Sequence, residues 1–121
     1  MASQREQQQE ETHFKVMQLL DENPSISTRK IAQKVGISNG SAYYCVTALV
    51  EKGFVKMGNF SRNPRKRQYA YLLTTKGMSE KTRLTKAFIA RKRFEYARLL
   101  AEIDTLEEEL SAEISRSLKR F

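Results

Sequence analysis

The first half of the chain contains three segments in which apolar side chains recur every three or four residues, as on one face of an α-helix. A serine precedes the second and the third segment, and its hydroxyl can cap the first free amides of a helix. A glycine follows each of these two segments and supplies the left-handed conformation that often closes a helix. The pattern predicts helices over 11–20, 28–35 and 39–52, with Ser27 and Ser38 as N-caps.

The helix predicted over 39–52 has two different faces. Two helices joined by a tight turn, the second exposing a polar and aromatic strip, are typical of a helix-turn-helix motif. Taken alone, the pattern also fits any three-helix bundle. The apolar face carries Ala42, Cys45, Val46, Leu49 and Val50, and the opposite face carries Gly40, Tyr43, Tyr44 and Thr47.

Two short segments rich in strand-forming residues come next, over 54–60 and 68–74, on either side of a loop. The loop, 61–67, has Pro64 at its centre and four basic residues among its seven. Three helices followed by a hairpin with a cationic tip is the order of a winged helix-turn-helix. We therefore predict a mainly α (α+β) fold, in which a winged helix-turn-helix domain with a two-stranded wing precedes a long C-terminal dimerisation helix.

The C-terminal third has no Gly or Pro after Gly77, so one helix can run from Ser79 to about Lys119, roughly 60 Å at 1.5 Å per residue. A helix longer than the domain before it must bury its apolar stripe against a partner, most simply a second copy of the chain. The spacings begin as heptads and drift toward an eleven-residue repeat, which predicts a weakly supercoiled homodimer. A lone exposed helix is the alternative. The seam comprises Tyr96, Leu99, Ile103, Leu106, Leu110, Ile114, Leu118 and Phe121.

The net charge of +8 is unevenly distributed. Residues 1–28 hold two bases and five acids (−3), residues 29–98 hold 17 bases and three acids (+14), and residues 99–121 hold three bases and six acids (−3). The basic middle indicates a polyanion or an acidic partner, although a solvated surface without a partner is possible. Within the long helix the basic first half and the acidic second half favour antiparallel pairing. Alternatively, the bases at 91–93 face DNA or the acidic first helix.

Composition argues against several other classes of protein. One Cys and one His allow no internal disulfide and no zinc site, and we expect no metal and no cofactor. No apolar run exceeds five residues and no secretory signal is readable, so we expect a cytoplasmic, nucleoid-associated protein that does not enter a membrane. Catalytic residues are not expected, because His13 is placed on the first helix away from Cys45, which falls on a buried face.

A family resemblance rests on the segment from Ser27 to Val55 and on Tyr71-Leu-Leu-Thr-Thr-Lys-Gly77. These stretches resemble the MarR-type winged-helix regulators of bacteria, and within them a subgroup associated with exopolysaccharide (EPS) gene clusters. The resemblance covers roughly residues 12–78, and its most specific parts are the Leu49-x-x-x-Gly53 helix ending and the Leu73-Thr-x-x-Gly77 exit from the wing. It implies a bacterial transcription regulator that binds double-stranded DNA and dimerises through flanking helices.

The docking geometry of helix-turn-helix proteins predicts which residues would contact DNA. Those expected to read bases are Ser38, Asn39, Ser41, Tyr43, Tyr44 and Thr47. Those expected to hold the backbone are Thr28, Arg29 and Lys30 at the start of the second helix, and Arg62, Arg65, Lys66 and Arg67 on the wing. Alternatively, the tyrosines pack against the preceding helix, and the wing bases form a solvated loop or a nuclear-import run.

The expected organisation is a polar tail or helix extension (1–10), a DNA-binding domain (11–78) and a dimerisation helix (79–121). The leading interpretation is a dimeric, sequence-specific transcription regulator without enzymatic activity. The alternative is a winged-helix interaction module that docks an acidic protein or RNA without reading sequence. The operator, the regulated genes, the sign of regulation and any small-molecule effector are not readable from the sequence.

Overall fold

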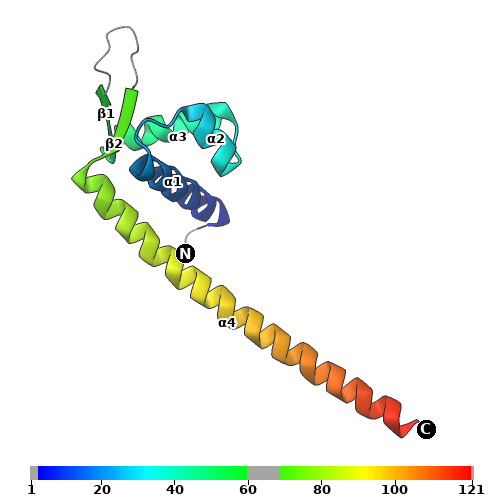
Figure 1. Ribbon diagram of the computed structural model, residues 1–121. Coiled ribbons are helices and arrows are strands. Elements are labelled where there is room, and N and C mark those ends of the chain that lie inside the picture. Colours follow the sequence, from blue (N-terminus) through cyan, green and yellow to red (C-terminus); the bar gives the residue numbers. More distant parts are fainter. Residues whose placement is uncertain (1–2, 60–68, 121) are drawn as a thin grey trace. The chain divides into compact units, whose positions relative to one another are not determined.

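The computed structural model describes residues 3–59 and 69–120 and contains four helices and a two-stranded antiparallel sheet (Figure 1). The chain divides into a first unit that ends at Thr85 and a second unit that begins at Lys86. The predicted mainly helical class with a two-stranded wing and a long C-terminal helix is confirmed. In chain order the elements are α1 (Gln4–Glu22), α2 (Thr28–Val35), α3 (Asn39–Glu51), β1 (Val55–Asn59), β2 (Tyr69–Leu73) and α4 (Thr75–Lys119).

The ends of α2 and α3 follow the predicted capping residues. The Ser27 hydroxyl accepts a hydrogen bond from the Lys30 N–H at 3.1 Å, and the Ser38 hydroxyl accepts one from the Ser41 N–H at 3.0 Å. Gly36 closes α2 with φ of 80° and Gly53 follows α3 with φ of 78°, a conformation that costs a side-chain-bearing residue energy. Local chemistry therefore fixes the short connection between the two helices.

Helix α1 extends through most of residues 1–10, the segment that was expected to be either a polar tail or a helix extension. It begins at Gln4 rather than near residue 11, and the hydroxyl of Ser3 caps it by accepting from the Glu6 N–H at 3.2 Å. The segment before Glu11 is almost entirely polar, so it shows no apolar periodicity even though Gln and Glu form helices readily. The N-terminal residues are therefore helical although they contribute nothing to the core.

The core of the first unit lies where α1, α2 and α3 meet the strands. It takes side chains from every helix, including Leu84 from the first part of α4, which is 2% exposed. The burial of so many apolar side chains is the main stabilising contribution to this unit. The buried cluster consists of Val16, Met17, Leu20, Ile26, Ile31, Ala32, Ala42, Cys45, Val46, Leu49, Val55 and Leu84.

The sheet is anchored to the helices at one end. Strands β1 and β2 pair from Val55↔Leu73 to Asn59↔Tyr69, and the Tyr71 N–H donates to the Pro24 carbonyl at 3.0 Å. Thr74, expected to end the second strand, instead links the strand to α4. Its hydroxyl donates to the Gly53 carbonyl at 2.6 Å and accepts from the Gly77 N–H at 3.0 Å.

Helix α4 begins at Thr75, four residues before the predicted start at Ser79, so Gly77 lies in its first turn. The reason for a glycine here is a close approach between two backbone segments. A Cβ at position 77 would lie 1.9 Å from the carbonyl oxygen of Phe54, so no larger residue fits without movement. The helix can therefore start close to the turn between α3 and β1.

The second unit consists of the remainder of α4. None of the residues 86–120, which the structure describes in full, is buried. Among residues 86–120, Phe88 is half-buried and the other large apolar side chains are substantially exposed, from 43% for Leu100 to 72% for Phe94 and Leu118. Most of the helix, residues 86–119, thus contributes no buried side chain to an intrachain core.

Candidate nucleic-acid interface

The outer face of α3 presents two neighbouring tyrosines. Tyr43 is 59% exposed and Tyr44 is 74% exposed, and their rings meet edge to face with centroids 6.2 Å apart. The alternative that these tyrosines pack as core residues against the preceding helix is therefore wrong. Large aromatic side chains at this exposure on a short helix are available to contact a ligand.

The start of α3 offers polar side chains on the same exposed face. Asn39 and Ser41 are exposed, whereas Thr47 is only partly exposed. The hydroxyl of Ser38 accepts from the Ser41 N–H and donates to the Ser41 hydroxyl at 2.9 Å. The Ser38 hydroxyl thus makes its hydrogen bonds within the helix cap. Asn39 is therefore the better placed of the two for contact with a DNA base.

Helix α3 carries no basic residue, and Glu51 is its single charge. A surface of this kind recognises a ligand by hydrogen bonds and apolar contact rather than by attraction of phosphate. If the protein binds a polyanion, the basic residues that attract it must therefore lie on neighbouring elements.

The start of α2 is one source of such bases. Arg29 and Lys30 are exposed, and Thr28 is partly exposed. Because the Ser27 hydroxyl already occupies the Lys30 amide, the first two amides of the helix are the ones that could face an anion. These residues lie on the helix that immediately precedes α3, as the sequence predicted.

The wing is the second source. Its four predicted contact residues, Arg62, Arg65, Lys66 and Arg67, lie outside the described residues. The strands that lead to them are held to the end of α3 through Thr74 and through Lys76, whose Nζ donates to the Lys52 carbonyl at 3.0 Å. Lys56 on β1 is also exposed, and the strand pattern of this segment did not single it out as a candidate contact residue.

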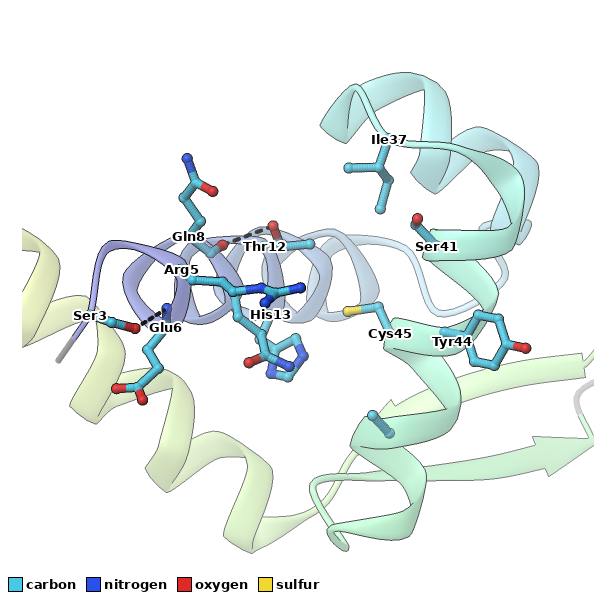
Figure 2. A pocket seen from close by; sticks show the side chains of 12 residues that line it. Ser3, Arg5, Glu6, Gln8, Thr12, His13, Ile37, Ser41, Tyr44 and Cys45 are labelled. Atoms are coloured by element: carbon cyan, nitrogen blue, oxygen red, sulfur yellow. Dashed lines mark hydrogen bonds between the residues drawn. The ribbon is translucent and has the colours of Figure 1, made fainter.

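A groove of about 750 Å³ lies within the first unit between α1 and the outer part of α3 (Figure 2). His13 and Cys45 both line it, so the prediction that His13 lies away from Cys45 is wrong. Figure 2 shows the sulfur of Cys45 directed toward α1. The sequence contained a usable signal, because apolar positions on both helices require α1 and α3 to pack together. The other lining residues are Ser3, Arg5, Glu6, Gln8, Gln9, Thr12, Ile37, Ser41, Tyr44 and Ala48.

The pKa shifts of Cys45 and His13 at this groove do not favour nucleophilic chemistry. Burial raises the pKa of the Cys45 thiol to about 11, partly offset by Lys52, so the thiolate is scarce at neutral pH. Burial and the charge of Lys52 lower the pKa of His13, against the opposing effect of Glu10 and Glu80. The groove thus holds a neutral thiol and an imidazole that favours its neutral form.

The acidic first helix is paired with the first part of α4. The Lys81 ammonium lies 2.8 Å from the Asp21 carboxylate, and the Arg83 guanidinium lies 3.9 Å from that of Glu10. Arg83 also hydrogen-bonds Glu80 and thereby lowers the pKa of that carboxyl. Part of the basic charge of the chain is thus neutralised internally.

The predicted dimerisation seam is exposed along the second unit. Its side chains from Tyr96 to Leu118 are between 48% and 72% exposed. Phe121, the last predicted member, lies outside the described residues. The seam is therefore present as an apolar stripe, and the described chain supplies nothing to cover it.

The described residues show neither a candidate metal site nor a membrane span. Within residues 3–59 and 69–120, three or more His, Cys, Asp or Glu side chains nowhere gather as a metal site would require. No helix in this part of the chain combines the length and the apolar character of a membrane span.

Comparisons with known proteins agree with this geometry. The winged helix-turn-helix DNA-binding family matches residues 9–56. No curated protein matches the sequence. Among solved structures, the PcaV transcriptional regulator from Streptomyces coelicolor has a TM-score of 0.62 and 18% identity, over 91% of this chain and 79% of its own.

Two further structures are similar. A MarR/EmrR family transcriptional regulator from Acinetobacter sp. ADP1 has a TM-score of 0.57 and 21% identity, over 83% of this chain and 75% of its own. The transcriptional repressor CouR, bound to a 23-mer DNA duplex, has a TM-score of 0.57 and 25% identity, over 93% of this chain and 74% of its own. The chain thus carries a winged helix-turn-helix domain and has the fold of the MarR-family transcriptional regulators.

Proposed function

We propose that this chain is a dimeric transcription regulator that binds double-stranded DNA with sequence specificity and has no enzymatic activity. The main support for this function is the exposure of Tyr43 and Tyr44 on the outer face of α3, the second helix of a helix-turn-helix. In this fold the second helix is the element that enters the major groove.

Base reading falls mainly to Asn39 and to the tyrosines. An asparagine can bond the N6 and N7 edge of adenine with both ends of its amide, and an aromatic ring can contact the methyl group of thymine. The tyrosine hydroxyls reach phosphate oxygens and fix the helix in register. Because α3 bears no basic residue, we expect half-sites rich in A·T base pairs.

Affinity for the backbone comes from the elements on either side of α3. Thr28, Arg29 and Lys30 at the start of α2 contact phosphates, and the arginines of the wing enter the adjacent minor groove. Arginine is favoured in narrow A·T-rich minor grooves, which agrees with the base preference proposed for α3.

Dimerisation through the exposed seam of the second unit would present two such domains to one DNA duplex. A two-fold dimer binds a pseudo-palindromic operator whose half-sites are separated by whole helical turns. Occupation of the operator blocks or alters access of the polymerase, and it places the protein with the nucleoid in the cytoplasm. The sequence resemblance to the EPS-associated subgroup is the basis for proposing exopolysaccharide genes as targets.

The chemistry of the groove supports a binding role over an enzymatic one. A nucleophilic thiol needs a lowered pKa, whereas burial raises that of Cys45 to about 11. The groove instead adjoins Ser41 and Tyr44, two of the residues that would contact DNA.

A nuclease footprint on the DNA upstream of the protein's own gene tests the proposal. We expect two protected half-sites one helical turn apart or a multiple of it, at about 0.15 M salt and with unlabelled bulk DNA in excess. Binding that shows no preference over bulk DNA would contradict the proposal and favour a winged-helix module that docks an acidic protein or RNA.

A further inference from the structure

The apolar stripe of the second unit is expected to pack against another surface. The charges of the same unit indicate what that surface is. The side chains of the stripe, from Tyr96 to Leu118, are about half exposed or more. Residues 86–119 belong to a single helix, and none of the described residues of the unit, 86–120, is buried. A helix with such a stripe is stabilised chiefly by packing against another surface.

The charges of this unit are separated along the helix axis. Residues 86–98 hold five bases and one acid, a net charge of +4, and residues 99–121 hold three bases and six acids, a net charge of −3. Two ion pairs lie along the helix itself: Lys92 Nζ is 3.5 Å from the Glu95 carboxylate, and Arg98 Nε is 3.9 Å from that of Glu102. Pairs this exposed contribute little and leave the asymmetry between the two halves intact.

We propose that the second unit pairs with a second copy of itself in antiparallel orientation, about a two-fold axis close to residues 99–101. This proposal rests on the dimer proposed above and adds its geometry. An antiparallel pair sets each +4 half beside a −3 half of its partner, twice per dimer, whereas a parallel pair sets like charge beside like charge along its whole length.

The position of the axis follows from the same charges. The bases of 86–98 are centred near residue 92 and the acids beyond residue 99 are centred near residue 107, so opposite charges face each other when the axis lies about midway. At that register the apolar residues also meet. Tyr96 lies level with Ile103 of the other copy, and Ile89 lies level with Leu110.

Single cysteines introduced into the full-length chain test the orientation, in a background in which Cys45 is replaced by alanine. With the axis near residue 100, Leu99→Cys lies beside its own counterpart and should form a disulfide-linked dimer on mild oxidation. The cysteine of Ile114→Cys would be roughly 42 Å from its counterpart, at 1.5 Å per residue, far beyond the about 4 Å between Cβ atoms that a disulfide requires.

In a parallel pair both cysteines lie beside their counterparts, so efficient self-linkage of Ile114→Cys overturns the proposal. A mixture of the Ile89→Cys and Leu110→Cys proteins provides the positive counterpart, since we expect mixed linked dimers in excess of either self-linked form. Sedimentation of the same Cys45→Ala protein shows whether it is a dimer at all. A monomer, or a larger assembly, overturns the proposal as well.

The dependence of dimerisation on salt is a second measurement that needs no cysteine. Opposite charges across the interface predict that raising NaCl from about 0.05 to 0.5 M weakens the dimer, by roughly tenfold, because exposed charges are screened at short range. A dimer that tightens with salt indicates like charges in register and overturns the antiparallel arrangement. The footprint on operator DNA is scored separately, so an incorrect orientation and a failure to read DNA remain distinguishable.

Discussion

The two units of this chain share the same kind of sequence pattern but differ in what their apolar side chains pack against. In both, apolar residues recur at helical spacing, and α4 passes from one unit into the other without a break in its helical structure. Leu84, in the first unit, is 2% exposed and joins a core built from every helix, whereas Leu106, in the second, is 63% exposed. Periodicity predicts that a helix will form, and the surrounding chain decides whether its apolar face is buried within one molecule or between two.

The largest effect is expected when the same leucine-to-alanine substitution is made once in each unit. Leu84→Ala removes a buried side chain and leaves a cavity, so it should lower the free energy of unfolding by about 2–5 kcal/mol at any protein concentration. Leu106→Ala should leave the unfolding of the first unit almost unchanged and weaken dimerisation. Urea denaturation at two protein concentrations, together with sedimentation equilibrium, measures both.

Equal losses of unfolding free energy in the two variants, independent of concentration, would contradict the division into an intramolecular core and an intermolecular stripe. A matched pair of this kind is informative because the side chain removed and the helix are the same. The environment of the leucine is what differs.

The next effect concerns the start of α4. Alanine is ordinarily favoured over glycine in a helix, yet Gly77→Ala places a Cβ within 1.9 Å of the Phe54 carbonyl oxygen and should cost about 1–3 kcal/mol. Gly40→Ala, in the first turn of α3, meets nothing closer than the Ser38 hydroxyl at 4.0 Å and should be neutral or slightly stabilising. Denaturant midpoints of the two variants give the comparison, and a stable Gly77→Ala protein would show that the contact relaxes easily.

Much of the first unit could be predicted because its elements begin and end at residues with strong local preferences. Ser27, Gly36 and Ser38 fixed the bounds of α2 and the start of α3 from sequence. The start of α1 could not be found in this way, because a polar helix outside the core leaves no apolar pattern. The early start of α4 was equally hidden, since it depends on a contact between Gly77 and a residue 23 positions earlier.

The candidate site likewise has a part that could be predicted from the sequence and a part that could not. The exposed face of α3 was predictable from helical periodicity, which places Tyr43 and Tyr44 opposite the core. The groove lined by both His13 and Cys45 was not predicted: the apolar faces of α1 and α3 indicate that the two helices pack together, but they do not give the angle at which the helices meet. The base-reading and backbone roles of individual residues remain predictions.

A smaller effect is expected from removing the most exposed tyrosine of α3. Tyr44→Ala should weaken operator binding roughly tenfold, in line with the loss of a base or phosphate contact, and change the free energy of unfolding by less than about 0.5 kcal/mol. Tyr96→Ala, also at an exposed tyrosine but in the second unit, is the matched control. Above the concentration at which the protein dimerises, it should bind operator DNA as the unmodified protein does.

Gel-shift titrations with the operator, paired with thermal denaturation, distinguish these outcomes. A large fall in melting temperature for Tyr44→Ala would assign the ring a structural role. Loss of DNA binding by Tyr96→Ala at saturating protein would instead mean that the second unit contributes to the interface with DNA.

The smallest expected effect is the pH dependence introduced by His13, a half-buried group of the first unit. Burial and the nearby Lys52 lower the pKa of this imidazole below 6.5 in the folded state, while Glu10 and Glu80 oppose the shift. The unfolded chain then binds the proton more readily than the folded one, so this contribution to stability is present above about pH 6.5 and is lost as the pH falls. His13→Gln removes the titrating group, and the stability of the unmodified protein relative to the variant should decline between pH 8 and pH 5. Urea titrations across this range measure the difference; a relative gain at low pH would mean that the carboxylates of Glu10 and Glu80 dominate the environment of the imidazole.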